Sequence, residues 1–280
     1  MDTLKYEKLT LTYDESETLL TVTDCEKDAV EVFIPEEVNG LPVIAIGDNA
    51  FNGCDKLVCV TVPDNADYFA ELDDVLGFEI GDQAFAECKS LKNVDLPFSV
   101  SSIGHGAFRD CEALEEIVLP DCYIGPYAFY RCYSLKKVNP IDIISEGVFS
   151  HCKSLSEFPV KEGTPEIGED AFEHCYALTE AVIPASVKRI EQLAFRNCHN
   201  LKTVTFEEPT EWYSRSSYTM KDYPIDVLEP EHNAAVLRGM DFDDGCGGWF
   251  RMTESDSHKP QKSLDEIIKE IEEWQEKNKK

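Results

Sequence analysis

Several patterns that would assign this chain to a common functional class are missing from its 280 residues. No run of 18 apolar residues occurs, so the sequence predicts no membrane insertion. The CxxC pair typical of zinc and redox sites is absent, as are HExxH, a glycine-rich phosphate loop and a serine elbow. We therefore predict no catalytic residue, no metal site and no cofactor.

Positive charge is also scarce, because 26 Lys and Arg face 55 Asp and Glu, for a net charge of −29. Such a surface repels phosphate backbones and anionic lipids, which argues against nucleic acid and lipid as partners. A basic protein would be attracted to it. Solubility alone is the simpler explanation of the charge.

The first 16 residues, MDTLKYEKLTLTYDES, lack a basic patch followed by an apolar stretch. This predicts that no signal peptide is present and that the protein is cytoplasmic. A secreted or cell-surface location is the alternative if a signal has been removed. The 11 cysteines are an odd number, which favours reduced thiols.

What the sequence does contain is a repeat. The motif IGDNAFNGCDKL at residues 46–57 returns as IGDQAFAECKSL, IGHGAFRDCEAL, IGPYAFYRCYSL, ISEGVFSHCKSL, IGEDAFEHCYAL and IEQLAFRNCHNL. The seven units lie within residues 31–206. Their shared aromatic positions are Phe51, Phe85, Phe108, Phe129, Phe149, Phe172 and Phe195. Their cysteines are Cys54, Cys88, Cys111, Cys132, Cys152, Cys175 and Cys198.

Each unit ends in a segment of the form LxxVxLP, such as LKNVDLP, and a unit of this length predicts one turn of a leucine-rich solenoid. The LxxVxL segments should form parallel strands, each ended by a proline that cannot donate to the ladder. The glycine after isoleucine should permit a tight corner. The phenylalanines should stack into a spine along the core.

These residues resemble the BspA-like leucine-rich repeats of bacterial surface antigens. The stretch IGEDAFEHCYALTEAVIPASVKRI follows that family's pattern closely, and VEVFIPEEVNGLPVIAIGDNAF is similar to its first-repeat form. The resemblance covers residues 31–206. It implies a curved solenoid used for adhesion or protein binding, without catalysis. Members are often exported, and this chain departs from them because it lacks a visible signal.

Four interpretations of the repeat cysteines compete. Disulfides between neighbouring units would meet the Cα separation, but seven is odd and the side chains would point in parallel. A nucleophile is needed once, not seven times. For zinc, His151 and His174 each precede a repeat cysteine and would stack on neighbouring coils, but solvated surface histidines are the preferred interpretation. Burial at a tight corner is favoured for the cysteines, which are small and apolar.

Four cysteines lie outside the repeat register: Cys25, Cys59, Cys122 and Cys246. The stretch GCGGWF around Cys246 is similar to the nucleophile neighbourhood of papain-like proteases, but the second small residue and helix start are missing. DFDDG, at residues 241–245, begins like a calcium loop, yet Met252 stands where the twelfth-position glutamate should be. We expect neither site.

The flanking sequence predicts a cap at each end of the solenoid. Residues 1–30 alternate apolar and polar and predict a β-hairpin with DESE as its turn. Residues 207–252 predict a mixed α/β cap, with a short helix in DVLEPEHNAAVLRG and a final strand in GGWFRM. A polar linker, residues 253–262, precedes an amphipathic helix at 263–280. That helix is expected to dock on the solenoid, and a partner contact is the alternative.

The second unit carries an insertion at residues 64–77, DNADYFAELDDVLG. Its apolar spacing predicts a short helix that packs back onto the solenoid. Insertions in repeats often lie on the binding face, which makes Tyr68 and Phe69 candidate contacts.

The third and fifth positions of LxxVxL should point to solvent on the concave face. They supply the candidate partner-binding residues Cys59, Thr61, Asn93, Asp95, Glu116, Val118, Lys137, Asn139, Glu157, Glu180, Val182, Thr203 and Thr205. This face is mixed polar with an acidic centre. It lacks the stacked aromatics typical of sugar binding.

The sequence thus predicts a right-handed leucine-rich repeat solenoid with a parallel β-sheet on its concave face, a β-hairpin N-cap and a mixed α/β C-cap. We predict a monomeric, non-catalytic module that binds a protein partner, possibly a basic one, through that face. One alternative is an acidic inhibitor or immunity-type protein that neutralises a basic toxin or enzyme. Another is a fragment of an adhesin-type surface protein.

Overall fold

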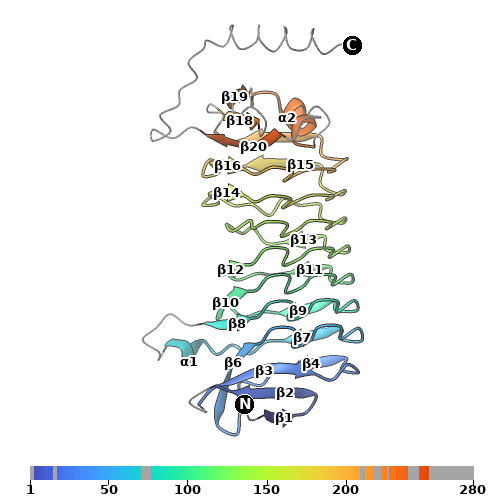
Figure 1. Ribbon diagram of the computed structural model, residues 1–280, viewed down its shortest axis with the longest axis vertical. Helices are drawn as coiled ribbons and strands as arrows, with labels where there is room; N and C mark the ends of the chain where they lie inside the picture. Colours follow the sequence, from blue (N-terminus) through green and yellow to red (C-terminus); the bar gives the residue numbers. More distant parts are fainter. Residues whose placement is uncertain are drawn as a thin grey trace.

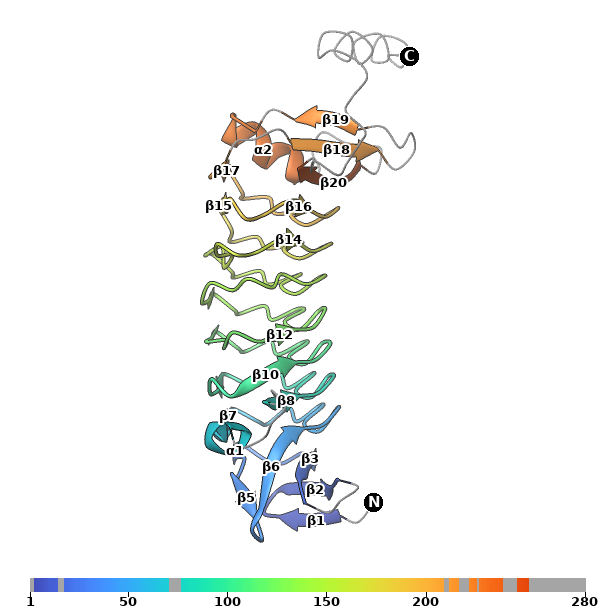
Figure 2. The same cartoon turned by 90° about the vertical axis from the view of Figure 1, so that its left-hand side faces the viewer.

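The structure is a computed structural model that describes residues 3–14, 18–70, 77–208, 212–216, 222–225, 227–238 and 246–251. These residues form an elongated stack of coils, with the N-terminal strands at one end (Figure 1). The stack is close to straight in two perpendicular views (Figures 1 and 2). Short strands line two of its faces.

The first face carries the LxxVxL strands. They are β7 (Cys59–Thr61), β9 (Asn93–Asp95), β11 (Glu116–Ile117), β13 (Lys137–Val138), β15 (Glu180–Ile183) and β17 (Thr203–Phe206), preceded by β4 (Glu31–Phe33). The pairs β4–β7–β9, β11–β13 and β15–β17 are all parallel, which confirms the predicted parallel sheet. In the fifth unit, residues 155–160 are described and make only an isolated parallel bridge, from Val160 to Ile141, and Pro159 has no amide to donate to a ladder.

The second face carries strands that end at the repeat isoleucine, and the repeat alignment did not predict them. They are β6 (Leu41–Ile46), β8 (Phe78–Ile80), β10 (Val100–Ile103), β12 (Tyr123–Ile124), β14 (Glu166–Ile167) and β16 (Arg189–Ile190). From β6 to β12 the pairing is parallel, and a bridge joins Ile144 to Ile167. Several of these strands have only two residues, too few for an alternating apolar pattern to reveal.

The N-terminal end has three antiparallel strands, one more than the predicted hairpin, and the second and third lie on either side of the predicted DESE turn. They are β1 (Thr3–Tyr6), β2 (Leu9–Tyr13) and β3 (Leu20–Cys25). Between β1 and β2 the chain turns at Glu7, whose φ is 50°. Strand β3 pairs in parallel with β6, so these strands continue the second sheet. A two-residue strand, β5 (Glu37–Val38), pairs antiparallel with β6.

The C-terminal end has a small mixed unit. It contains β18 (Trp212–Ser216), β19 (Asp222–Ile225), α2 (Pro230–Leu237) and β20 (Cys246–Arg251). Strand β20 pairs antiparallel with β16 and extends the second sheet. The buried amide of Asn233 donates to the carbonyls of Val204 and Val227 at 3.1 and 3.0 Å, which ties α2 to the last coil. Residues 241–245, 253–262 and 263–280, for which predictions were made, lie outside the described residues.

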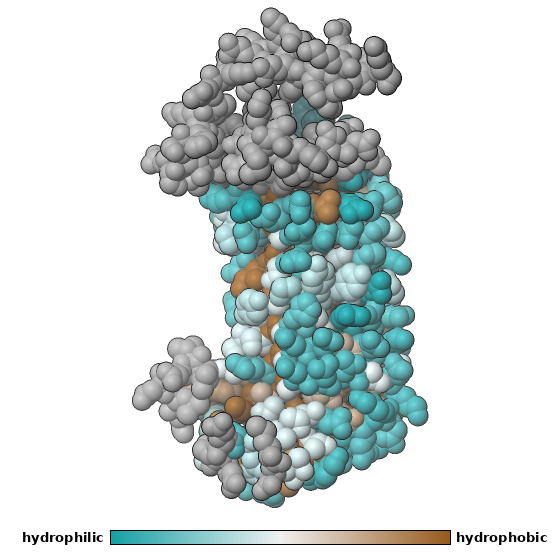
Figure 3. Space-filling model, viewed as in Figure 1, coloured by the Kyte–Doolittle hydropathy of each residue, from teal (hydrophilic) through white to brown (hydrophobic). Residues whose placement is uncertain are grey.

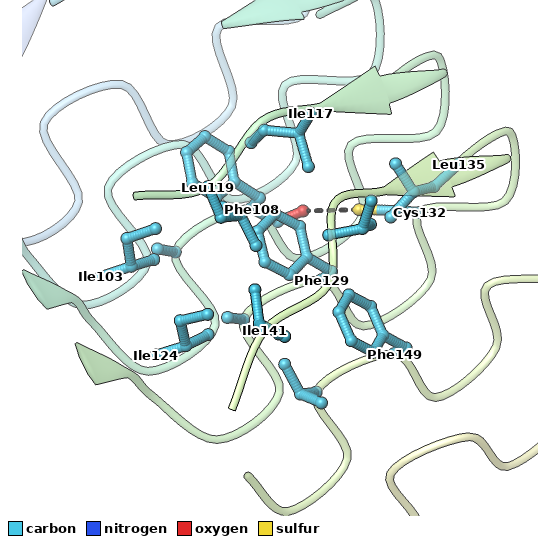
Figure 4. Close-up of a cluster of buried hydrophobic side chains, with 14 of the residues drawn as sticks. Ile103, Phe108, Ile117, Leu119, Ile124, Phe129, Cys132, Leu135, Ile141 and Phe149 are labelled. Atoms are coloured by element: carbon cyan, nitrogen blue, oxygen red, sulfur yellow. Dashed lines mark hydrogen bonds between the residues drawn. The ribbon is translucent and has the colours of Figure 1, made fainter. Parts of the chain in front are cut away.

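The seven repeat phenylalanines form the predicted spine. All are fully buried, and successive rings stack with centroids 4.8 to 5.7 Å apart. Figure 4 shows Phe108, Phe129 and Phe149 of successive coils among the core leucines and isoleucines. Offset-stacked rings stabilise by about 0.5–1.5 kcal/mol per pair beyond their buried area, so the spine joins each coil to its neighbours.

Candidate functional site

The strand face, meaning the third and fifth positions of the segments from β4 to β17, is open to solvent. Every candidate partner-binding residue on it is exposed or half-buried. Where strands pair, the residues stand directly opposite one another: Cys59 and Asn93, Glu116 and Lys137, Glu180 and Thr203. The candidate residues therefore form two columns that run along the stack. Figure 3 shows that the side of the molecule viewed in Figure 1 is mostly hydrophilic, with a narrow hydrophobic band along the stack.

The third-position column is largely acidic. It includes Glu31, Glu116, Glu157 and Glu180, all exposed. Lys137 interrupts it and lies 3.5 Å from the carboxylate of Glu157. An exposed ion pair of this kind stabilises little, so Lys137 changes the local charge more than the fold.

The fifth-position column is mixed, because Thr61, Asp95 and Thr205 are polar and Pro159 is buried, and three of its residues expose large apolar side chains. Phe33, Val118 and Val182 are 68%, 67% and 48% exposed. Asn139 differs from them, because its side chain accepts from the Leu119 amide at 2.7 Å and donates to the Leu119 carbonyl at 2.9 Å. Asn139 therefore joins two coils and is less available to a partner than the sequence suggests.

Glu31 and Phe33 were missed in the sequence. Strand β4 places them opposite Cys59 and Thr61, one coil before the first recognised repeat. That coil lacks the IGxxAFxxC motif on which the repeats were aligned. The stretch EVFIP is nevertheless similar to CVTVP, and this was the available signal.

The insertion in the second unit forms the predicted short helix, α1 (Ala66–Ala70). It packs beside β6 and β8, on the same side as the second sheet (Figure 1). Phe69 is buried in the core, and the ring of Tyr68 packs edge-on against it with the two ring centroids 5.8 Å apart. The suggestion that Phe69 contacts a partner is therefore wrong, because its ring is needed to attach the helix.

The repeat cysteines are buried, as predicted, and all seven side chains are 0% exposed. Six of them donate the thiol proton to the carbonyl of the preceding coil's spine phenylalanine, at 2.9 to 3.3 Å. Figure 4 shows this bond from Cys132 to Phe108. Burial raises the pKa of Cys88 and Cys198 to about 12, which removes their nucleophilic form at neutral pH. All ten cysteines whose side chains are described are free thiols.

Cys54 is different, because the first unit has no preceding spine phenylalanine. Its sulfur lies 3.9 Å from the Cys25 carbonyl and 3.7 Å from the Lys27 ammonium. The neighbouring Cys25 thiol, and then the positive charge of Lys27, lowers the pKa of Cys54 below that of an ordinary thiol. Cys54 is therefore the repeat thiol with the greatest thiolate character.

We expect iodoacetamide to modify the native protein at Cys59 and then Cys54, before any of the other six repeat cysteines. Cys59 is half-buried on the strand face and is the most accessible of these thiols. Cys54 is as buried as the other six repeat cysteines, but its pKa is lowered, whereas burial raises the pKa of each of the six. Peptide mass spectrometry after timed alkylation measures the order. The variant Lys27→Met should slow Cys54 and leave Cys59 unchanged. Equal rates for all seven repeat cysteines would contradict the assignment.

A third surface, the turn edge, is formed by the turns that run from the residue after the repeat isoleucine to the residue after the repeat cysteine. In every unit, two of its residues have a left-handed backbone: the one before alanine (before valine in the fifth unit) and the one before cysteine. Aromatic and imidazole rings make a continuous series along this edge, with centroids 4.3 to 5.8 Å apart. The series is His105, Tyr127, Tyr130, His151, His174, Tyr176 and His199. The stacked rings missing from the strand face are therefore present at another edge.

The centre of the turn edge has ligand atoms of the kind that bind metal ions. One nitrogen of His151, one nitrogen of His174 and a carboxylate oxygen of Glu173 lie within 4.8 Å of one another. Burial, and then the neighbouring His174, lowers the pKa of His151 and favours its neutral form. Burial beside Glu173 raises the pKa of Asp170 to about 6.

Comparison with known protein families identifies the family of this chain. Six copies of the BspA type leucine rich repeat region match residues 30–72, 78–141 and 122–223, which is more than half of the chain. The chain belongs to the BspA-type leucine-rich repeat family. No curated protein sequence matches it.

Among solved structures, this BspA-type protein is similar to a leucine rich cell surface protein from Faecalibacterium prausnitzii A2-165. The TM-score is 0.55 at 23% identity, over 82% of this chain and 62% of that one. A leucine-rich repeat protein of T. pallidum gives a TM-score of 0.47 at 23% identity, over 63% and 91% of the two chains. A leucine-rich repeat protein from Bacteroides capillosus ATCC 29799 gives a TM-score of 0.40 at 29% identity, over 49% of this chain and 96% of that one. The similarity to the Faecalibacterium prausnitzii protein supports the fold alone.

BspA-type proteins are typically non-enzymatic and located at the surface or outside the cell. The cytoplasmic location predicted for this member is therefore not supported. In the part of the chain that the structure describes, no helix is long and apolar enough to cross a membrane.

Proposed function

We propose that this BspA-type protein binds a protein partner through the strand face. The observation that carries the proposal is the pair of columns that run side by side across successive coils, one with four exposed glutamates and the other with three exposed large apolar side chains among polar ones. Exposed apolar side chains beside charged ones are typical of protein-binding surfaces. The right-handed solenoid with a cap at each end remains the predicted arrangement that would keep this face rigid.

The face is long and narrow. Eight coils contribute to it, and at about 4.8 Å per strand they extend over about 34 Å. Two positions per coil are fewer than the roughly 20–30 residues that each side of a standard interface contributes, so a partner must also contact residues beside the two columns. We infer a partner with basic groups opposite the glutamates and separate apolar groups opposite Phe33, Val118 and Val182.

The triple variant Glu116→Lys, Glu157→Lys, Glu180→Lys is expected to weaken partner binding roughly 100-fold at low salt, because three attractive contacts become repulsive. The matched control is Glu79→Lys, Glu112→Lys, Glu166→Lys, which changes net charge equally at exposed sites off the strand face. Affinity capture from native extract with mass spectrometry identifies the partner, and titration of that partner measures both variants. Full binding by the strand-face variant would exclude this face.

The acidic column also supports the alternative of an inhibitor of a basic toxin or enzyme. Such a complex should dissociate steeply with salt, whereas a complex dominated by contacts to Phe33, Val118 and Val182 should persist. Capture at low and high salt separates the two. The adhesin-type alternative agrees with the family's usual location, and detection of the protein on intact cells with an antibody would favour it.

A further inference from the structure

The turn edge places His151 and His174 on neighbouring coils by backbone geometry alone. Both directly precede a repeat cysteine and have left-handed φ values of 64° and 59°. The amide of His151 donates to the carbonyl of Glu173 at 2.7 Å. The two imidazoles stack with centroids 4.3 Å apart and an angle of 26° between their planes. Their relative position is thus held by the repeat itself.

Glu173 adds an oxygen to the two imidazole nitrogens, and the three ligand atoms lie within 4.8 Å of one another. A tetrahedral zinc ion with bonds of about 2.1 Å needs its ligand atoms about 3.4 Å apart. Ligand atoms at the upper end of that separation must therefore approach each other by about an ångström or more, which rotation of the side chains can achieve. All three side chains are half-buried, so they can move and an ion can reach them.

The neighbours of His174 orient it as a metal ligand. The amide nitrogen of Asn197 lies 3.2 Å from Nε2 and can only donate, so Nε2 carries the lone pair. The proton is then on Nδ1, which donates to the Tyr176 hydroxyl at 2.9 Å. A histidine that binds a metal through one nitrogen usually donates from the other in this way. An ion would take the place of the Asn197 amide at Nε2.

One cation already competes for the carboxylate. Arg196 Nε lies 3.6 Å from the same Glu173 oxygen that is 3.6 Å from His174 Nε2. The surroundings also include Glu169 and Asp170, whose carboxylates add negative potential near the cluster. Arg196 therefore sets how strongly an added ion is held.

We propose that His151, Glu173 and His174 form a binding site for a divalent transition-metal ion, with Zn²⁺ as the best match. Two imidazoles and one carboxylate are a ligand set that zinc uses in proteins, and solvent can fill its fourth position. Calcium and magnesium prefer oxygen ligands and should bind much more weakly. The site would link two coils at the turn edge, apart from the strand face.

Titration of the full chain, without a histidine tag, with ZnCl₂ in a calorimeter tests the site. We expect one saturable site per chain, and no comparable binding of CaCl₂. His151→Gln and His174→Gln should each weaken Zn²⁺ binding roughly tenfold or more, and Tyr176→Phe by roughly tenfold through loss of orientation. Arg196→Gln should strengthen binding, because it removes the competing cation. His105→Gln, at the same edge but outside the cluster, is the matched control and should bind as the unaltered chain does.

Two further measurements keep the outcome clear. Circular dichroism must show that each variant is folded. The absorbance of the Co²⁺ complex distinguishes nitrogen and oxygen ligands from thiolate, which would indicate a cysteine site. No saturable binding up to about 1 mM, far weaker than a built zinc site, would overturn the proposal. So would unchanged binding in the His151→Gln, His174→Gln double variant.

Discussion

Replacing Phe129 by alanine should lower the free energy of unfolding by about 3–5 kcal/mol. Phe129 is fully buried, and its ring stacks on Phe108 at 5.4 Å and on Phe149 at 5.7 Å. Its removal leaves a cavity at the middle of the spine and breaks contacts to the coils on both sides. Urea unfolding followed by circular dichroism measures the change.

Phe98→Ala is the matched control, because Phe98 is 90% exposed and lies outside the spine. It should change the free energy of unfolding by less than about 0.5 kcal/mol. Because repeat arrays can unfold in segments, the Phe129 variant should also broaden the transition. Equal effects of the two substitutions would show that the spine is not what joins the coils.

Gly104→Ala should lower the free energy of unfolding by about 2–3 kcal/mol. A Cβ added at Gly104 would lie 2.6 Å from the amide nitrogen of Asp82 and from the carbonyl carbon of Gly81, both in the preceding coil. The coils must separate locally to accept it. Ser145 and Glu191 occupy the equivalent position in two units, so some adjustment is available and the loss should stop short of unfolding.

Gly53→Ala is the comparison. Gly53 has a φ of 70°, and nothing lies within 4 Å of an added Cβ. Alanine at this position should lower the free energy of unfolding only through the strain of the left-handed backbone, about 1 kcal/mol. Chemical denaturation of both variants under the same conditions gives the difference. If both lost the same stability, the approach of neighbouring coils would not be the reason for glycine at position 104.

Gly104 corrects the prediction made for the glycine that follows the repeat isoleucine. It was expected to permit a tight corner through its backbone freedom, yet Gly104 and Gly125 do not have left-handed φ values. They are needed because the preceding coil approaches too closely for a side chain. The left-handed positions of the turn are instead occupied mostly by other residues, such as Gln83 and Arg131. Nothing in a single unit could reveal this, because the close contact belongs to the neighbouring coil.

The strand face and the turn edge are two separate surfaces of the same coils. The sequence found most of the first, because the LxxVxL positions alternate between core and solvent, and it missed Glu31 and Phe33 only where the motif is degenerate. It correctly predicted that His151 and His174 stack on neighbouring coils, but not the rest of the series of rings on the turn edge. His151 and Glu173 are 22 residues apart, and their proximity depends on how one coil stacks on the next.

The repeat pattern by itself determined the leucine-rich repeat class, the parallel strands, the phenylalanine spine and the burial of the cysteines. Each of these depends on hydrophobic positions that recur at a fixed spacing, and such positions must face inward wherever the coils stack. Only the tertiary structure decided the second sheet, the thiol bond from Cys132 to the Phe108 carbonyl and the low pKa of Cys54. The same is true of the position of Glu173 beside His151 and His174. The physical reason is that these features are contacts between coils, set by the register and spacing of the stack rather than by the residues of one unit.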